Sequence, residues 1–166
     1  MTNKNVEKAS FSSASGTTGR VVAARIFPNL DVISTLEEIC FKHGIKYGQI
    51  TTTIGSLRKI NLHYVSNATP GEGEKYTTHM EMESGFSVLS GQGLVSPGDE
   101  PGTMNIHYHA VVSGENDVIY GGHIEKGTIT LTTLDVFIQE IHGIEISREK
   151  DNSTGVNIIV TAFKEI

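Results

Sequence analysis

The chain has the length and composition of one globular domain. It has 166 residues, of which 37% are hydrophobic and 19% charged, with 18 glycines and a net charge of −6. This profile is typical of a turn-rich protein with much sheet, and the chain is long enough to bury a core. The acidic balance and the lack of a Lys/Arg cluster argue against nucleic acid as a partner of the isolated chain.

Neither an export signal nor a membrane span is predicted. No apolar run in the sequence could form the core of a signal peptide or cross a bilayer. The single cysteine, Cys40, falls inside an apolar helical pattern, so we expect a buried thiol and a reducing compartment. We therefore expect a cytoplasmic protein with no membrane partner.

The chain divides into a tail and one domain. Residues 1–19 are rich in Ser, Thr, Asn and Lys and have no periodicity, so we predict a flexible N-terminal tail and a single domain over residues 20–166. A strand is predicted from Val21 to Phe27, where Pro28 interrupts it. One helix follows, with Asp31 as its N-cap and Gly44 at its C-terminal end. Its apolar residues recur at helical spacing: Val32, Leu36, Ile39 and Cys40.

In most of the remaining chain, apolar and polar residues alternate as they do in β-strands. The loops between them are predicted at residues 67–78, 96–102 and 143–155, where the sequence is polar or rich in Gly and Pro. A final strand should pack back onto the sheet. One helix packed on a mostly antiparallel sheet is an α+β fold. The predicted strands are Gly48–Ile54, Leu57–Val65, Phe86–Val95, Met104–Ser113, Val118–Ile124, Thr128–Ile141 and Val156–Phe163.

Two histidines share the polar face of the strand over Met104–Ser113. His107 and His109 alternate with apolar residues that should be buried in the core. Side chains two residues apart in a strand are about 7 Å apart, close enough for two imidazoles to bind one ion. His123 follows Gly121-Gly122 in the next predicted strand, and the SGEND segment between the two strands has the composition of a hairpin turn. That hairpin would bring His123 beside the pair.

A simpler interpretation also fits these residues. The histidines can be polar side chains on a solvated sheet face, and the glycine pair can serve a bulge or a close backbone approach without any ligand. The other histidines are predicted to be ordinary, partly exposed side chains. They are His43, His63, His79 and His142.

If a metal binds, three imidazoles without cysteine predict a site with an open coordination position. Zinc is the expected ion, and nickel and iron stay open because imidazole also accommodates them. Such an ion can activate water or polarise a carbonyl, which leaves a metal-dependent hydrolase or lyase open. Glu125 is a candidate base or a partner of the ligands, and the alternative is a surface carboxylate in a turn.

Several motifs together resemble the plant-and-prokaryote conserved (PPC) domain family. The resemblance covers about Arg20 to Ile141 and depends on the order and spacing of its pieces. These are HGI at 43–45, IGSL at 54–57, FSVLSGQG at 86–93 and HYHAVVSGENDVIYGGH at 107–123. It implies an α+β domain, a homotrimer, and a divalent metal at His107, His109 and His123, as in some prokaryotic members.

The chain departs from the plant members of this family. It has no RGRP-like AT-hook, and residues 84–89 read SGFSVL in place of a GRFEIL-like hexapeptide. We therefore expect a stand-alone, bacterial-type PPC protein that binds a divalent metal, zinc foremost, and a small-molecule ligand or substrate. The alternatives are a DNA-associated regulatory protein that acts through its oligomer surface, and a ligand-binding module without chemistry.

Overall fold

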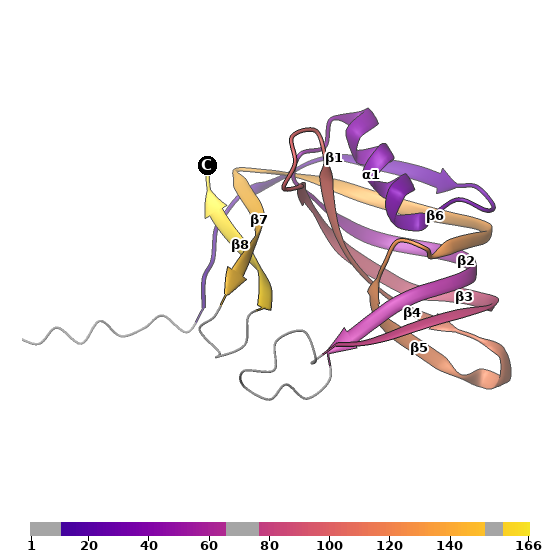
Figure 1. Cartoon of the computed structure of the whole chain (residues 1–166). Coiled ribbons are helices and arrows are strands. Elements are labelled where there is room, and N and C mark those ends of the chain that lie inside the picture. The colour runs from indigo at the N-terminus through magenta and orange to yellow at the C-terminus, as the bar shows by residue number, and fades with distance from the viewer. Residues whose placement is uncertain (1–10, 66–76, 152–157) are drawn as a thin grey trace, which may run out of the picture.

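The computed structural model describes residues 11–65, 77–151 and 158–166. Within them one helix and eight strands follow one another along the chain (Figure 1). They are β1 (Thr17–Ile26), α1 (Val32–His43), β2 (Gly48–Val65), β3 (Thr77–Pro97), β4 (Met104–Ser113), β5 (Ile119–Ile124), β6 (Ile129–His142), β7 (Ile144–Asp151) and β8 (Ile158–Glu165). A short 3₁₀ turn, Glu115–Asp117, joins β4 to β5.

Six strands form one antiparallel sheet in the order β1-β6-β2-β3-β4-β5. The sheet curls so strongly that β5, at its edge, also pairs with β2. This closure uses two residue pairs, Leu62 with Ile124 and His63 with His123. In Figure 1 the strands wrap around a common interior, and β7 and β8 stand apart as a separate hairpin. The predicted α+β class and antiparallel pairing are confirmed.

The helix begins and ends where the sequence predicts. The carboxylate of Asp31 accepts a hydrogen bond of 2.8 Å from the backbone N–H of Ser34, which satisfies a free donor of the first turn. Gly44 adopts a left-handed conformation with φ of 63° and closes the last turn. On the apolar face of the helix, Leu36 and Cys40 are fully buried in the core, and Ile39 packs against it partly buried.

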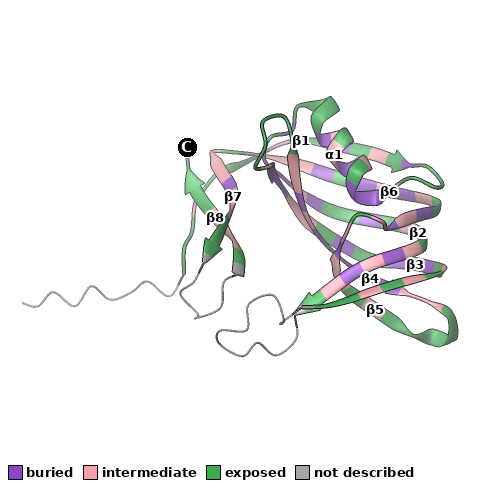
Figure 2. Ribbon diagram, in the orientation of Figure 1, coloured by how far each residue is buried: buried purple, intermediate pink, exposed green. Residues whose placement is uncertain are grey.

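The core lies inside the curled sheet and under α1. Figure 2 shows buried and exposed residues alternating along the strands, as expected when one face of a sheet packs inward. On β4 the predicted apolar face is the inner one, and its central residues Ile106, Tyr108, Ala110 and Val112 are all buried. The hydroxyl groups of Tyr108 and Thr53 form a buried hydrogen bond of 2.6 Å. His107 and His109 consequently face outward.

The predicted break in the second strand is wrong. β2 runs without interruption for 18 residues, and its pairing with β6 shifts register around Gly55. A side chain at Gly55 would lie 2.0 Å from the carbonyl oxygen of Thr133, so this glycine permits a close approach of two strands. The Gly-Ser signal therefore marks an irregularity in the ladder, not a turn.

The predicted loop at residues 143–155 and the place of the final strand also need correction. Ile144–Asp151 is strand β7, whose partner is β8. These two strands form their own sheet, so β8 does not join the six-stranded sheet as expected. Polar residues outnumber apolar ones in β7, whose buried residue is Ile146.

At the N-terminus, β1 begins at Thr17, three residues inside the predicted tail. Ser15 is also held, because its backbone N–H and hydroxyl donate to the Glu165 carboxylate at 2.9 and 2.7 Å. The predicted polar loop at 67–78 lies mostly outside the described residues. Of the helices that the structure describes, none has the length and apolar character needed to cross a membrane.

Candidate metal centre

The β4–β5 hairpin brings the three predicted histidines together. His109 and His123 are directly opposite each other on the paired strands. The predicted turn is present: the backbone N–H of Gly114 donates to the carbonyl of Val118 at 2.9 Å, and Asn116 takes a positive φ of 60°. His107 is two residues before His109 on the same face of β4. We call these three residues the histidine triad.

The geometry of the triad resembles that of a metal site. One ring nitrogen from each histidine lies within 4.8 Å of the other two. Nε2 of His107 and Nε2 of His109 are 3.1 Å apart. Two nitrogens bound to one tetrahedral zinc ion at about 2.0–2.1 Å are roughly 3.3 Å apart. The backbone therefore presents at least two of the imidazoles at close to the required spacing.

Two further histidines extend the triad into a row across four strands. His63 on β2 pairs with His123 on one side and with His79 on β3 on the other. The rings of His63 and His123 stack with centroids 4.6 Å apart, and those of His63 and His79 are 5.3 Å apart. His63 and His79 were predicted to be ordinary side chains. His63 instead lies against the triad, because β2 closes onto β5 at this residue.

A glycine allows this closure. A side chain at Gly122 would lie 2.5 Å from the carbonyl oxygen of His63, so only glycine lets β5 approach β2 here. The close backbone approach, which was the simpler interpretation of the glycine pair, is thus correct. It also has a consequence for the site, since it places His63 beside His123.

Glu125 brings a carboxylate to the edge of the triad. The backbone N–H of Glu125 donates to the carbonyl of Asn61 at 2.8 Å, which anchors the turn after β5 to β2. Its Oε1 lies 2.9 Å from Nδ1 of His63 and 3.8 Å from Nε2 of His123. Nδ1 of His63 is buried and has no hydrogen bond, although the Glu125 carboxylate lies close to it. His63, His123 and Glu125 form a second group of ligand type.

Arg148 reaches the triad from the separate hairpin. Its Nη1 lies 2.7 Å from Nδ1 of His107 and 3.1 Å from Oγ1 of Thr161 on β8. A guanidinium can only donate hydrogen bonds, so Nδ1 of His107 accepts in this contact. Sequence reasoning missed Arg148, because residues 143–155 were interpreted as a loop. The alternation of Ile144 and Ile146 with polar residues is the signal that could have revealed the strand.

The histidines of the triad are held in the neutral form. Burial, followed by the charge of Arg148, lowers the pKa of His107 to about 4. Burial, followed by the neighbouring His63, lowers the pKa of His123 to about 3. The pKa of His109 is lowered for the same two reasons. A neutral imidazole has a lone pair available for a metal ion, so these shifts favour ligation at neutral pH.

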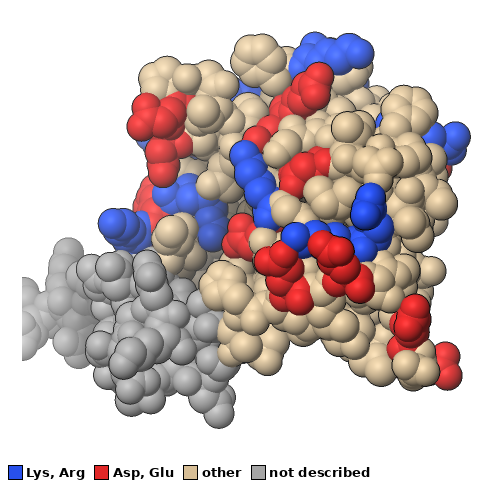
Figure 3. Space-filling model, turned by 45° about the vertical axis from the view of Figure 1, so that its right-hand side comes forward, with Lys and Arg blue, Asp and Glu red and all other residues tan. Residues whose placement is uncertain are grey.

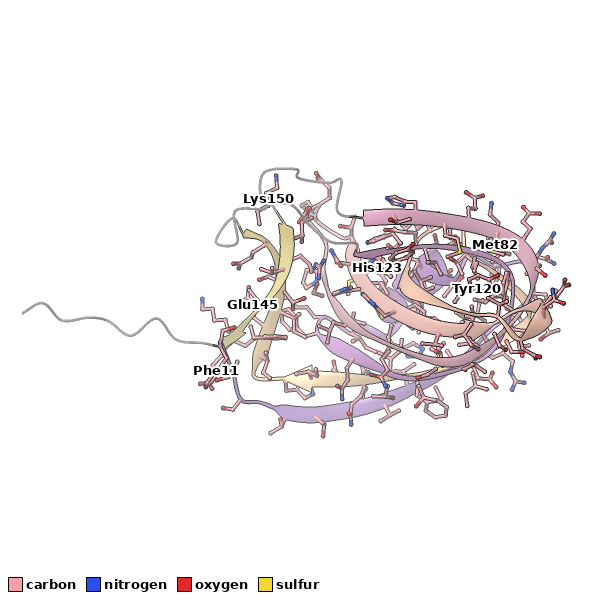
Figure 4. All side chains as sticks on the ribbon, turned by 90° about the horizontal axis from the view of Figure 1, so that it is seen from below. Phe11, Met82, Tyr120, His123, Glu145 and Lys150 are labelled. Carbon is pink, nitrogen blue, oxygen red and sulfur yellow. The ribbon has the colours of Figure 1, made fainter. Side chains whose placement is uncertain are left out.

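Cavities open on both sides of the triad. One of about 510 Å³ lies between the sheet and the β7–β8 hairpin and is lined by His123, Glu125, Arg148 and Lys150, among others. Another of about 450 Å³ is lined by His107 and His109. In Figure 4, His123 lies on the side of the curled sheet that faces the hairpin with Glu145 and Lys150. A small molecule could therefore reach the triad.

The residues present fit a divalent metal. The donor set is three neutral imidazoles at near-ligand spacing, and a buried ring nitrogen beside them, Nδ1 of His63, lacks a hydrogen bond. Unsatisfied buried polar atoms are uncommon in folded proteins and often indicate an ion or water. Cys40 contributes nothing to this site: it is buried in the core, and burial raises the pKa of its thiol to about 12.

Solved structures with the same fold include proteins from archaea and bacteria. A metal-containing protein of Archaeoglobus fulgidus superposes with a TM-score of 0.74 at 23% identity, covering 90% of this chain and 99% of that one. A plant- and prokaryote-conserved protein of Pyrococcus horikoshii gives 0.70 at 22% identity, with coverages of 90% and 97%. A Bacteroides thetaiotaomicron protein provisionally named as DNA-binding superposes with a TM-score of 0.66 at 19% identity. The match covers 87% of this chain and 96% of that one. At these identities the likeness shows the fold.

The sequence itself also has relatives. Two bifunctional GlmU proteins of Synechococcus strains are 24% identical to it over 136 residues, or 82% of this chain. The chain spans about a fifth of the length of these curated relatives, at 19% and 20%. Residues 13–142 match the family model of the Plants and Prokaryotes Conserved (PCC) domain. Because this match takes in well over half of the 166 residues, the chain belongs to the Plants and Prokaryotes Conserved domain family.

Proposed function

We propose that this protein binds a divalent metal, zinc foremost, through His107, His109 and His123, and binds a small molecule at the open position of that metal. The observation that carries the proposal is the triad itself, with three ring nitrogens within 4.8 Å of one another. The name of the Archaeoglobus relative as a metal-containing protein supports it. Imidazole also accommodates nickel and iron, so zinc is proposed on the grounds of ligand type alone.

An open site of this kind has a defined chemical capacity. With three protein ligands, a bound zinc ion retains one position at which it can lower the pKa of a water molecule or polarise a carbonyl group. Glu125 places its carboxylate 3.8 Å from the Nε2 of His123, a ligand of the proposed metal. It is therefore the candidate base for a hydrolase or lyase activity. A role for Glu125 in orienting His63 and His123 is the alternative.

The proposed assembly is a homotrimer, for which the outer face of the sheet provides apolar surface. This face carries one exposed apolar side chain on each of three neighbouring strands: Ile54 on β2 (63% exposed), Leu89 on β3 (55%) and Val111 on β4 (41%). Burying such a row against a second copy would be favourable. Light scattering at micromolar concentration should give three times the chain mass of 18.0 kDa. An 18.0 kDa particle would contradict the assembly.

Metal analysis of the purified protein tests the site. Replacing His107, His109 or His123 by Ala leaves two imidazoles, too few for a tight zinc site, so each variant should lose most of the bound metal. His43→Ala and His142→Ala should retain it, since neither belongs to either ligand group. Wild-type metal content in the three triad variants would contradict the proposal.

The two ligand groups can be separated, because they share only one residue. His123 belongs to both, whereas His107 belongs to the triad and His63 to the group with Glu125. Metal at the triad predicts that His63→Ala retains the ion and His107→Ala loses it. The reverse result would place the ion between His63, His123 and Glu125.

A DNA-associated role is the second candidate, and the provisional name of the Bacteroides relative favours it. The net charge of −6 works against it. On the face shown in Figure 3, basic and acidic side chains are interspersed and form no continuous basic surface. A duplex titration at several salt concentrations tests this function, because phosphate contacts produce a steep fall of affinity with salt.

A further inference from the structure

The contact between Arg148 and His107 fixes where a proton lies. Nδ1 of His107 accepts from the guanidinium at 2.7 Å. A neutral imidazole that accepts at Nδ1 has its proton on Nε2. That Nε2 lies 3.1 Å from Nε2 of His109, so His107 donates to His109. Neither of these two nitrogens therefore has a free lone pair: Nε2 of His107 carries a proton, and Nε2 of His109 accepts the hydrogen bond.

A bound metal requires the opposite arrangement. A histidine that ligates a metal through Nε2 has its proton on Nδ1 and donates it to an acceptor. The guanidinium of Arg148 has no acceptor atom, and its charge is permanent. It also repels a divalent cation at the same imidazole. Arg148 and a metal therefore cannot both contact His107.

We propose that Arg148 closes the histidine triad in the metal-free protein, and that the metal enters by displacing its guanidinium from His107. This inference rests on the proposed metal site at the same triad. It assigns a role to the β7–β8 hairpin, which supplies Arg148 and Thr161 and otherwise lies outside the six-stranded sheet. The hairpin competes with the metal for one ligand.

The surroundings of Arg148 allow this exchange. Within the described residues, the hairpin shares no strand pairing with the six-stranded sheet, so Arg148 can withdraw without breaking a ladder hydrogen bond between the two sheets. The cavity of about 510 Å³ that Arg148 lines with His123 provides space for the displaced side chain. The hydrogen bond to Thr161, 3.1 Å long, ties the guanidinium to its own hairpin.

Zinc titration of the metal-stripped protein tests the proposal, with Arg148→Met compared with Lys150→Met. Methionine keeps much of the side-chain volume and removes the charge and the donors. Loss of a hydrogen bond to a charged group should let Arg148→Met bind zinc about tenfold more tightly than wild type. Lys150 lies on the same strand and lines the same cavity, but the hydrogen bond to His107 comes from Arg148. Lys150→Met should therefore bind zinc as wild type does.

The outcomes separate this inference from the proposed function. Zinc binding by wild type with equal or weaker binding by Arg148→Met overturns the role of Arg148 and leaves the metal site standing. No zinc uptake by either protein overturns both. A chelator competition at fixed protein concentration gives the affinities, and circular dichroism shows whether each variant is folded.

Nitrogen NMR of the imidazoles provides a second test that needs no comparison of variants. In the metal-free protein the His107 proton should be on Nε2, and zinc should move it to Nδ1. The His43 spectrum should not change, since that side chain is outside both ligand groups. A proton on Nδ1 of His107 in the metal-free protein would overturn the proposal directly.

Discussion

Acidification of the metal-free protein should destabilise it between about pH 6.5 and pH 3, and the histidine triad should be a main cause. An unfolded histidine titrates with a pKa of about 6.5. In the folded protein the pKa of His107 is about 4 and that of His123 about 3. Between these values the unfolded chain binds more protons than the folded one. Stability is therefore present above about pH 6.5 and is lost as the pH falls.

The size of the effect follows from these pKa values. A pH of 5 is about 1.5 units below the pKa of a histidine in the unfolded chain, so the unfolded histidines are protonated. In the folded state His107 and His123 are still mostly neutral at this pH. Each unit corresponds to about 1.4 kcal/mol, so two histidines give at most about 4 kcal/mol. Both side chains are partly accessible to solvent, which screens the effect, and we expect roughly half of this value, about 2 kcal/mol.

Urea unfolding followed by circular dichroism at pH 7 and pH 5, with a chelator present, measures this loss. The matched variant is His107→Gln/His123→Gln, which removes both titrating groups from the outer face of the sheet. It should lose about 2 kcal/mol less than wild type between the two pH values. His43→Gln, at an exposed helix end, serves as the control. Equal losses in wild type and the double variant would refute the reasoning.

Two further predictions concern the fold. Gly91→Ala should cost about 2–3 kcal/mol in urea unfolding, because the new methyl group would lie 2.0 Å from the Tyr108 hydroxyl and 2.3 Å from that of Thr53. Gly85→Ala on the same strand should stay within about 0.5 kcal/mol of wild type, since its nearest contact is Leu131 at 3.9 Å, and a cost as large as that of Gly91→Ala would contradict the packing. A chain that starts at Arg20 should melt several degrees below one that starts at Phe11, because it lacks the β1 residues paired with His142 and Ile141. Equal melting temperatures would show that the first residues of β1 contribute nothing.

Local signals in the sequence were sufficient for some elements. The helix has an N-cap, a regular apolar stripe and a C-terminal glycine, so both of its ends could be predicted. The bounds of β4 follow from strict alternation, and the short polar segment after it predicts the β4–β5 hairpin. The histidine triad lies entirely on that hairpin, which explains why a pattern within 17 residues could bring its members together.

Long-range pairings could not be predicted in the same way. The position of His63 beside His123 depends on the curl that brings β2 to β5, and nothing in the composition of either strand specifies that partner. Arg148 depends on two steps, the recognition of β7 as a strand and the packing of its hairpin near β4. Gly55 misled the interpretation because a glycine that permits close strand approach and one that makes a turn look alike in sequence.

The closure of β2 onto β5 rests on two residue pairs, and this has a consequence for the order in which the site forms. A hairpin can fold within microseconds, whereas contacts between distant segments must wait for larger loops to close. The triad can therefore assemble early in folding, with the β4–β5 hairpin. The group of His63, His123 and Glu125 exists only after the seam between β2 and β5 has closed. A local opening of that seam would separate His63 from His123 and leave the spacing of the triad intact.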